Sequence, residues 1–189
     1  IYEAHPAALA ARDEVFADIE LMQTPERIPS KKTPLDAGFI DLPQTLLAEH
    51  TADPNGSLIG RIQRTAAALR EDLDRFVVLG IGGSYMGARA LFEALCHPRH
   101  NELSRAERHG TPRIYFEGNN LDNDTLAGLL ELLRGHCRDR SDVDQRWGLT
   151  VISKSGGTAE TMAQYLVVRA WLNQALGPDA AVRHLAFTT

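Results

Sequence analysis

Four short apolar runs divide the chain after residue 75, at residues 76–81, 114–116, 149–152 and 185–187. Polar residues do not alternate with apolar ones inside these runs, which is typical of strands covered on both faces. Between the runs, apolar residues recur at helical spacing. The three helical patterns comprise Met86, Ala90, Leu91, Ala94 and Leu95, then Leu126, Leu129, Leu130 and Leu133, then Met162, Leu166, Ala170 and Trp171. The alternation predicts an α/β fold: a doubly wound, flavodoxin-like parallel sheet with helices on both faces.

The first part of the chain follows a different pattern. Phe16, Ile19 and Met22 among acidic residues predict a helix over residues 7–23, and four prolines predict an extended stretch over residues 24–43. The spacing of Ile62, Ala66, Leu69 and Leu73 predicts a further helix. We therefore expect a helical and extended lead-in over residues 1–50 and one domain over residues 51–189. Because the sequence has no initial Met and stops directly after a predicted strand, we expect a longer polypeptide, truncated at the C-terminus.

Composition narrows the function classes. The chain of 189 residues is 43% hydrophobic and 24% charged with a formal net charge of −5, which is ordinary for a globular protein. Without a block of Lys or Arg it offers no basic face to nucleic acid. The longest near-apolar run, residues 76–83, is too short to span a bilayer, and residues 1–13 do not resemble a signal sequence. We expect a cytoplasmic protein in which Cys96 and Cys137 stay reduced.

The first candidate binding loop follows the first predicted strand. Residues 80–87 read Gly-Ile-Gly-Gly-Ser-Tyr-Met-Gly and lead into a predicted helix. Glycine lets a ligand approach the backbone closely, and a helix N-terminus attracts anions. Neither the dinucleotide fingerprint nor the nucleoside-triphosphate loop is matched, since Tyr85 and Ala88 stand where those motifs need other residues. The loop therefore indicates an anion site, with tight strand-to-helix packing as the alternative explanation.

The second candidate loop follows the third predicted strand. Ser153, Ser155 and Thr158 surround two glycines, at a point where one hydroxyl would suffice as a helix cap. Lys154 could screen an anionic charge or be solvated. In doubly wound sheets of order 2-1-3-4-5, the first and third strands are neighbours and ligands bind in the crevice at their carboxyl ends. Amides and hydroxyls without a metal cluster or a bidentate arginine suit a monoester phosphate, so the two loops predict one pocket for a sugar phosphate.

The histidines, the turn at residues 117–120 and the nearby carboxylates give weaker evidence of a functional site. The seven histidines show no metal-ligand spacing with Cys or carboxylates, so we assign no metal. Residues 117–120, Glu-Gly-Asn-Asn, end the second predicted strand and are read as a turn, and Asp122 is expected to cap the next helix. Glu117 and Glu160 are the carboxylates nearest the crevice, but Glu160 in the first turn of a helix is expected to stabilise the helix dipole rather than to act as a base.

The two loops resemble those of the bacterial glucose-6-phosphate isomerase family, within the sugar isomerase (SIS) domain superfamily. The resemblance rests on residues 80–90 and 151–161, with the turn at residues 118–120 and the stretch 39–43 in support, and it extends from about residue 38 to the end. It implies an SIS domain whose sugar-phosphate ligands are Gly83, Ser84, Ser153, Lys154, Ser155, Thr158 and Thr161. Where family members often carry threonines in the second loop, this chain has Ser155, Gly156 and Gly157, which keeps hydroxyls at positions 155 and 158 and removes one from the middle.

The resemblance also implies an activity. The family interconverts glucose 6-phosphate and fructose 6-phosphate through a cis-enediol without a cofactor, commonly as a homodimer. Its catalytic glutamate, histidine, lysine and arginine belong to segments beyond this sequence, so we expect the chain to bind the phosphate and not to isomerise alone. Two alternatives stay open: a small complete phosphosugar isomerase, and a non-catalytic SIS module that senses sugar phosphates.

Overall fold

The computed structural model describes residues 5–32, 35, 39, 41–136, 139, 141–176 and 185–188. The chain forms two compact units, Ile1–Thr65 and Ala66–Thr189, and the boundary between them falls inside helix α3 (Leu58–Asp72). The division expected at residue 50 stays a prediction.

The first unit contains more regular structure than its prolines suggest. Helix α1 (Pro6–Met22) confirms the first predicted helix. The prediction of an extended stretch over residues 24–43 is wrong in its described part, because two 3₁₀ turns occupy Pro25–Arg27 and Ser30–Lys32 and helix α2 (Leu42–Ala52) begins before the stretch ends. Pro25 and Pro43 lie in the first turns of these elements, where a missing N–H group costs no hydrogen bond. Residues 33, 34, 36–38 and 40 lie outside the described residues.

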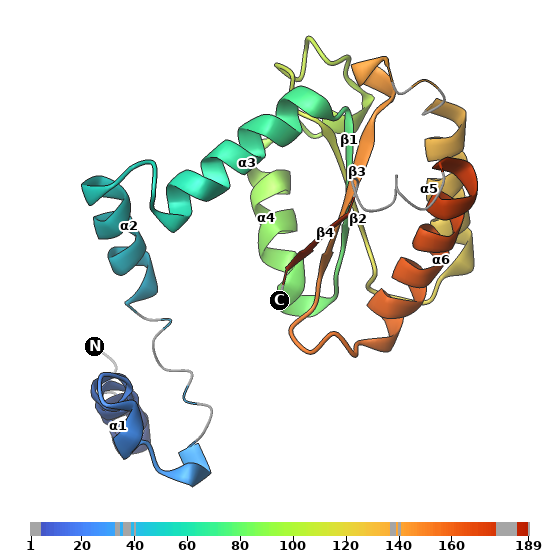
Figure 1. The fold of residues 1–189 in the computed structure, drawn as a ribbon. Helices are drawn as coiled ribbons and strands as arrows, with labels where there is room; N and C mark the ends of the chain where they lie inside the picture. Colours follow the sequence, from blue (N-terminus) through green and yellow to red (C-terminus); the bar gives the residue numbers. More distant parts are fainter. Residues whose placement is uncertain are drawn as a thin grey trace. The chain divides into compact units, whose positions relative to one another are not determined.

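The second unit is built on a four-stranded parallel sheet. Its strands are β1 (Arg75–Leu79), β2 (Arg113–Glu117), β3 (Trp147–Ile152) and β4 (Leu185–Thr188), in the order β2-β1-β3-β4 (Figure 1). All four predicted strands are confirmed. In the register Val77 of β1 lies opposite Tyr115 of β2 and Leu149 of β3. Because β1 lies between two strands, every one of its residues except Phe76 is buried, as its unbroken apolar run indicates.

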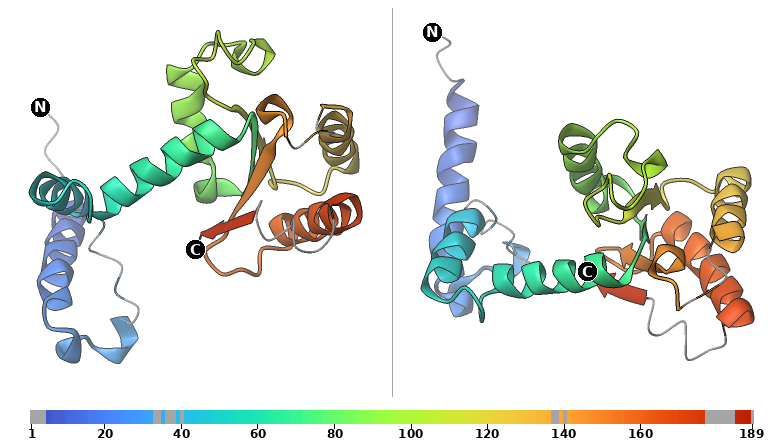
Figure 2. Two further views of the ribbon diagram at one scale, coloured as in Figure 1. Left: turned by 45° about the horizontal axis from the view of Figure 1, so that its top comes forward. Right: turned by 90° about the horizontal axis from the view of Figure 1, so that it is seen from above.

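Helices lie on both sides of this sheet. Helix α4 (Met86–Leu95) lies on one side, and α5 (Asn123–His136) and α6 (Ala159–Leu176) lie on the other (Figures 1 and 2). In its described part this unit also contains 3₁₀ turns at Gly82–Ser84, His100–Glu102 and Val143–Gln145. The α/β class and the parallel sheet are therefore confirmed.

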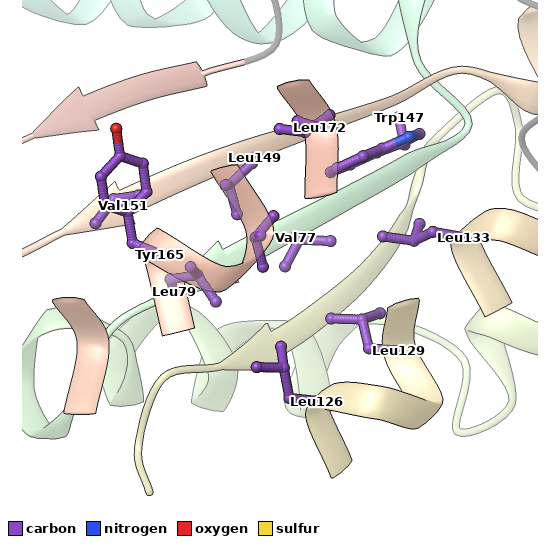
Figure 3. Packing of buried hydrophobic residues seen from close by; sticks show 11 residues of the cluster. Val77, Leu79, Leu126, Leu129, Leu133, Trp147, Leu149, Val151, Tyr165 and Leu172 are labelled. Atoms are coloured by element: carbon purple, nitrogen blue, oxygen red, sulfur yellow. The ribbon is translucent and has the colours of Figure 1, made fainter. Parts of the chain in front are cut away.

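The main hydrophobic core lies between the sheet and the helix pair α5 and α6 (Figure 3). Leu126, Leu129 and Leu133 of α5 are buried, which confirms the predicted apolar stripe of that helix. The stripe predicted for α6 is partly wrong: Met162 and Trp171 pack against the core, but Leu166 is 55% exposed and Ala170 is exposed, while Tyr165, Val168 and Leu172 are buried. Helix α6 carries apolar residues on more than one face, so its sequence periodicity is compatible with burial of either Leu166 or Tyr165. In the structure the face with Tyr165 packs against the sheet.

Arginines gather at the amino end of the sheet. The carboxylate of Asp74, which is 1% exposed, forms ion pairs with Arg75 at 2.9 Å, with Arg105 at 3.7 Å, and with Arg108 and Arg113. The side chain of Arg108 is fully buried. A buried carboxylate needs such partners because its desolvation is costly. This cluster joins the start of β1 to the start of β2 and to the segment that precedes β2.

Candidate functional site

The two predicted loops lie together at the carboxyl end of the sheet. Strands β1 and β3 are parallel neighbours, so the loops that follow them leave the same edge (Figure 1). Gly80 marks the contact between the loops. A Cβ atom added there would lie 3.3 Å from Cβ of Ser84 and 3.4 Å from the carbonyl oxygen of Ile152. The expected juxtaposition of the two loops is therefore present.

The first loop leaves its glycines open. Gly82 has a φ of +54° and begins the 3₁₀ turn Gly82–Ser84, a conformation that favours glycine. A Cβ atom on Gly83 would meet nothing within 4 Å. Helix α4 begins at Met86 without a side-chain hydrogen bond to its first turn. The loop thus presents backbone to its surroundings at the start of a helix, which is the arrangement that binds anions.

The second loop leaves hydroxyl protons available. The Oγ atom of Ser153 accepts a hydrogen bond from the backbone N–H of Gly156 at 3.0 Å, and the Oγ atom of Ser155 accepts one from the N–H of Gly157 at 3.2 Å. Gly156 has a φ of +68°, which allows this tight turn. Both serines act here as acceptors, so each can still donate its own proton to a ligand. Ser155 is exposed and Ser153 is buried.

The other three predicted ligands differ in accessibility. Thr158 is half-buried just before α6, and Lys154 is exposed. Thr161 is fully buried, and its hydroxyl donates to the carbonyl of Gly118 at 3.2 Å. Since a hydroxyl has one proton, Thr161 can donate to a phosphate only if it turns away from Gly118. Its role as a phosphate ligand stays a prediction, as do the roles of the other six residues.

A third segment lies against these loops that the sequence indicates only as a turn. Gly118 follows β2 with a φ of +97°, and a Cβ atom on it would lie 2.7 Å from the backbone nitrogen of Gly80. The turn at residues 118–120, called here the 118–120 turn, is therefore packed against the first loop. Gln164 of α6 donates from Nε2 to the carbonyl of Asn120 at 2.6 Å. In the sequence, the only signal for this contact is glycine directly after the strand.

The carboxylates near this edge differ in their electrostatics. Burial raises the pKa of Glu117, the nearby charge of Asp122 adds to the increase, and Arg89 partly offsets it. Asp122 accepts hydrogen bonds from the backbone of Asp124 and Thr125, which confirms the predicted helix cap, and its bonds to Thr125 and Asp124 lower its pKa. Glu160 lies in the first turn of α6. No hydrogen bond links Glu117 or Glu160 to the described serines of the second loop.

Other features of the second unit lie away from the two loops. A hollow of about 310 Å³ lies at the opposite end of the sheet, and it is lined by Ala67, Arg70, Glu71, Arg105, His109 and Gly110. None of the predicted phosphate ligands lines it. Among the described residues, no three histidine, cysteine or acidic side chains are grouped to hold a metal ion. Cys96 is unpaired, and Cys137 lies outside the described residues.

No helix in the described part of the chain combines the length and the apolar composition that a membrane crossing needs.

Curated proteins similar in sequence to this chain are named glucose-6-phosphate isomerase. The one from Symbiobacterium thermophilum is 37% identical over 179 residues, which is 93% of this chain and 36% of that protein. Those from Acetivibrio thermocellus and Shouchella clausii are 36% and 38% identical over 152 residues, which is 80% of this chain and 30% of each. The chain thus spans about a third of the length of these relatives. No family model matches it.

A solved structure is also similar to this chain. The crystal structure of a glucose-6-phosphate isomerase from Chlamydia trachomatis shares 27% sequence identity with it and a TM-score of 0.48. The match covers 67% of this chain and 20% of that one.

Proposed function

We propose that this chain, which is homologous to glucose-6-phosphate isomerases along most of its length, is the phosphate-binding part of such an enzyme. The observation that carries the proposal is the second loop, where Ser153 and Ser155 accept hydrogen bonds from backbone N–H groups and keep their protons for a ligand. A phosphate monoester is an acceptor with several oxygens, so converging donors are what it requires. The open backbone at Gly83 supports the same ligand from the other loop.

The role of each residue follows from its place. Gly83 and Ser84 would bind the phosphate from the first loop, and Ser153, Ser155 and Thr158 would donate hydroxyl protons from the second. Lys154 would add positive charge. Thr161 is a ligand implied by the resemblance. To bind the phosphate, its hydroxyl would have to give up its hydrogen bond to the carbonyl of Gly118. The site needs no cofactor and no metal, since hydrogen bonds to a dianion supply the binding energy.

The chemistry would be an aldose–ketose isomerisation of glucose 6-phosphate and fructose 6-phosphate through a cis-enediol. Holding the phosphate fixes C1 and C2 of the sugar relative to a base, and proton transfer depends on that geometry. Glu117 and Glu160 are the carboxylates at this edge, and neither is linked to the described serines of the second loop. We infer that the base comes from a part of the enzyme that this chain does not span. The chain alone would then bind substrate without turnover.

The proposal has three further parts. The sheet order β2-β1-β3-β4 with helices on both sides supports a doubly wound SIS domain. The resemblance of the two loops to bacterial isomerases supports a homodimeric enzyme of the cytoplasm. The hydroxyl-rich second loop supports specificity for the phosphate group, so free glucose should bind at least about tenfold more weakly than fructose 6-phosphate.

The test combines two measurements on purified residues 1–189. Titration calorimetry should show binding of fructose 6-phosphate and much weaker binding of glucose, and equal affinities would mean that the phosphate end is misplaced. A coupled glucose 6-phosphate assay beside a full-length isomerase should show no turnover by the chain. Turnover near the full-length rate would instead support a small complete isomerase, and Glu117→Gln would then be the first variant to assay. Binding by the chain together with inactivity of the complete gene product would support a sensing module.

A further inference from the structure

Two hydrogen bonds from helix α6 hold the 118–120 turn. Thr161 donates to the carbonyl of Gly118 at 3.2 Å, and Gln164 donates to the carbonyl of Asn120 at 2.6 Å. Strand β1 lies between β2 and β3, so a helix that follows β3 is tied here to the end of β2. These two bonds join the segment after β2 to the helix that follows β3, and the close packing of Gly118 against Gly80 places the loop after β1 beside them.

The hydrogen bond from Gln164 to the turn comes with an energetic penalty, the burial of an unpartnered side-chain oxygen. Gln164 is 3% exposed, and its Oε1 atom is buried without a hydrogen-bond partner in the described part of the chain. An unpartnered buried amide oxygen is unfavourable, and an apolar side chain of similar length would avoid this penalty. The favourable contribution of Gln164 is the hydrogen bond from its Nε2 atom to the carbonyl of Asn120. We therefore interpret Gln164 as a residue that holds the turn in place.

The turn presents an unused amide beside the phosphate loops. Asn119 and Asn120 are exposed. The Oδ1 atom of Asn120 accepts a hydrogen bond from the backbone of Asp122 at 3.2 Å, whereas the side chain of Asn119 has no hydrogen bond to any described residue. Gly118, directly before it, packs against Gly80 of the first loop. A carboxamide can donate and accept at once, and this matches the hydroxyl groups along a sugar chain.

We propose that the 118–120 turn forms the third side of the sugar-phosphate site, where the carboxamide of Asn119 binds hydroxyl groups of the sugar. Gln164 is a positioning residue for that contact. The inference rests on the proposed function, because it takes the phosphate to be held by the other two loops. It adds a contact that distinguishes a phosphosugar from a bare phosphate.

The experiment compares two ligands on the chain of 189 residues. Fructose 6-phosphate and inorganic phosphate are titrated by calorimetry into the unmodified protein, Asn119→Ala and Gln164→Met. Both variants should bind fructose 6-phosphate about threefold to tenfold more weakly, as expected for the loss of a neutral hydrogen bond, with unchanged affinity for inorganic phosphate. Gln164→Met should keep or raise the unfolding midpoint, which a merely structural role would lower. Gln174→Met, an exposed glutamine on the same helix, is the matched control.

The outcomes separate this inference from its premise. If the unmodified chain binds inorganic phosphate and fructose 6-phosphate equally well, or if Asn119→Ala weakens both ligands alike, the turn does not contact the sugar and the inference fails while the phosphate site stands. If the unmodified chain binds neither ligand, the proposed function fails and the inference fails with it.

Discussion

The two ends of the parallel sheet differ in whether their polar side chains are paired within the protein. At the amino end the buried carboxylate of Asp74 is paired with four arginines, and Arg105 also donates to the carbonyls of Arg70 and Leu73. At the carboxyl end Ser153 and Ser155 only accept bonds from their own loop, and Gly83 faces open space. At the amino end the charged side chains pair with one another. At the carboxyl end the serine hydroxyls can still donate hydrogen bonds to a ligand.

The difference shows that charge density alone does not locate a binding site. The arginines around Asp74 would attract an anion if they were free, but their charge is paired with Asp74 and Asp144. Several of their N–H groups also donate to backbone carbonyls, although Nε of Arg75 is buried without a hydrogen-bond partner among the described residues. The carboxyl end has fewer charges and more unused donors. We therefore propose that the amino end stabilises the fold and that the carboxyl end binds the ligand, a division that the variants below test.

Asp74→Asn should produce the largest effect, and on stability. Removal of the carboxylate leaves the buried guanidinium of Arg108 without its partner, which costs about 3–5 kcal/mol of unfolding free energy. Denaturation followed by tryptophan fluorescence reports on this unit, since Trp147 and Trp171 both belong to it. The control is Asp72→Asn, which breaks the more exposed pair with Arg146 and should cost about 1 kcal/mol or less. Equal losses of unfolding free energy in the two variants would show that the Asp74 cluster stabilises the fold no more than an exposed ion pair does.

Gly118→Ala should affect both stability and binding. Its φ of +97° and the approach of an added Cβ atom to Gly80 at 2.7 Å require the turn to shift, at a cost of about 1–3 kcal/mol. The same shift moves the first loop, so affinity for fructose 6-phosphate should fall as well. The matched control is Gly128→Ala in helix α5, where the added Cβ atom meets nothing within 4 Å and alanine should stabilise by about 0.5–1 kcal/mol. A Gly118→Ala protein with unchanged stability would contradict the close packing of the turn.

Ser155→Ala should act on binding alone. Each hydrogen bond to a charged ligand contributes roughly 1.5–3 kcal/mol, so the affinity for fructose 6-phosphate should fall by about tenfold or more. The unfolding midpoint should not change, because Ser155 is exposed. Ser141→Ala removes an exposed serine near the amino end of β3 and should leave the affinity unchanged. Unchanged affinity in Ser155→Ala would exclude this serine from the site.

Glu117→Gln should produce the smallest effect, visible as a pH dependence. Because burial raises its pKa in the folded state, Glu117 favours folding most when protonated, and this contribution is lost as pH rises from the ordinary glutamate range through the raised pKa. The glutamine variant should thus equal the unmodified protein in acid and be slightly more stable at neutral pH. Asp122, whose pKa is lowered by its bonds to Thr125, should show the opposite slope in Asp122→Asn. Unfolding midpoints across this pH range check both signs.

The four strands and the buried face of α5 could be predicted from apolar runs and periodicity, whereas the stripe predicted for α4 is wrong, because Met86, Leu91 and Leu95 are exposed. The strands are short and covered on both faces, so their residues stand out, and Leu126, Leu129 and Leu133 fit one face of α5 only. Helix α6 could not be oriented in this way, because Leu166 and Tyr165 belong to two equally periodic stripes and only the sheet decides between them. Helix α2 was hidden by Pro43, which marks a helix start as readily as a break.

The juxtaposition of the two candidate loops could be predicted from the sequence, and their contacts with the 118–120 turn could not. Glycines and hydroxyls after β1 and β3 indicate the edge at which the loops meet. The hydrogen bonds from Thr161 and Gln164 to the 118–120 turn join residues 43 and 44 positions apart. No local pattern encodes such contacts, because they depend on β1 lying between β2 and β3.

The most direct test of the assignment is a titration of the chain with inorganic phosphate, followed by amide NMR shifts. The account predicts that the largest shifts cluster at the carboxyl end, on Gly83, Ser84, Ser155, Gly156 and Thr158, and that they saturate together. The hollow at the amino end, lined by Arg70, Arg105 and His109, should show no saturable shift. Shifts that cluster around this hollow, with the two loops unchanged, would contradict the assignment of the phosphate site to the carboxyl end.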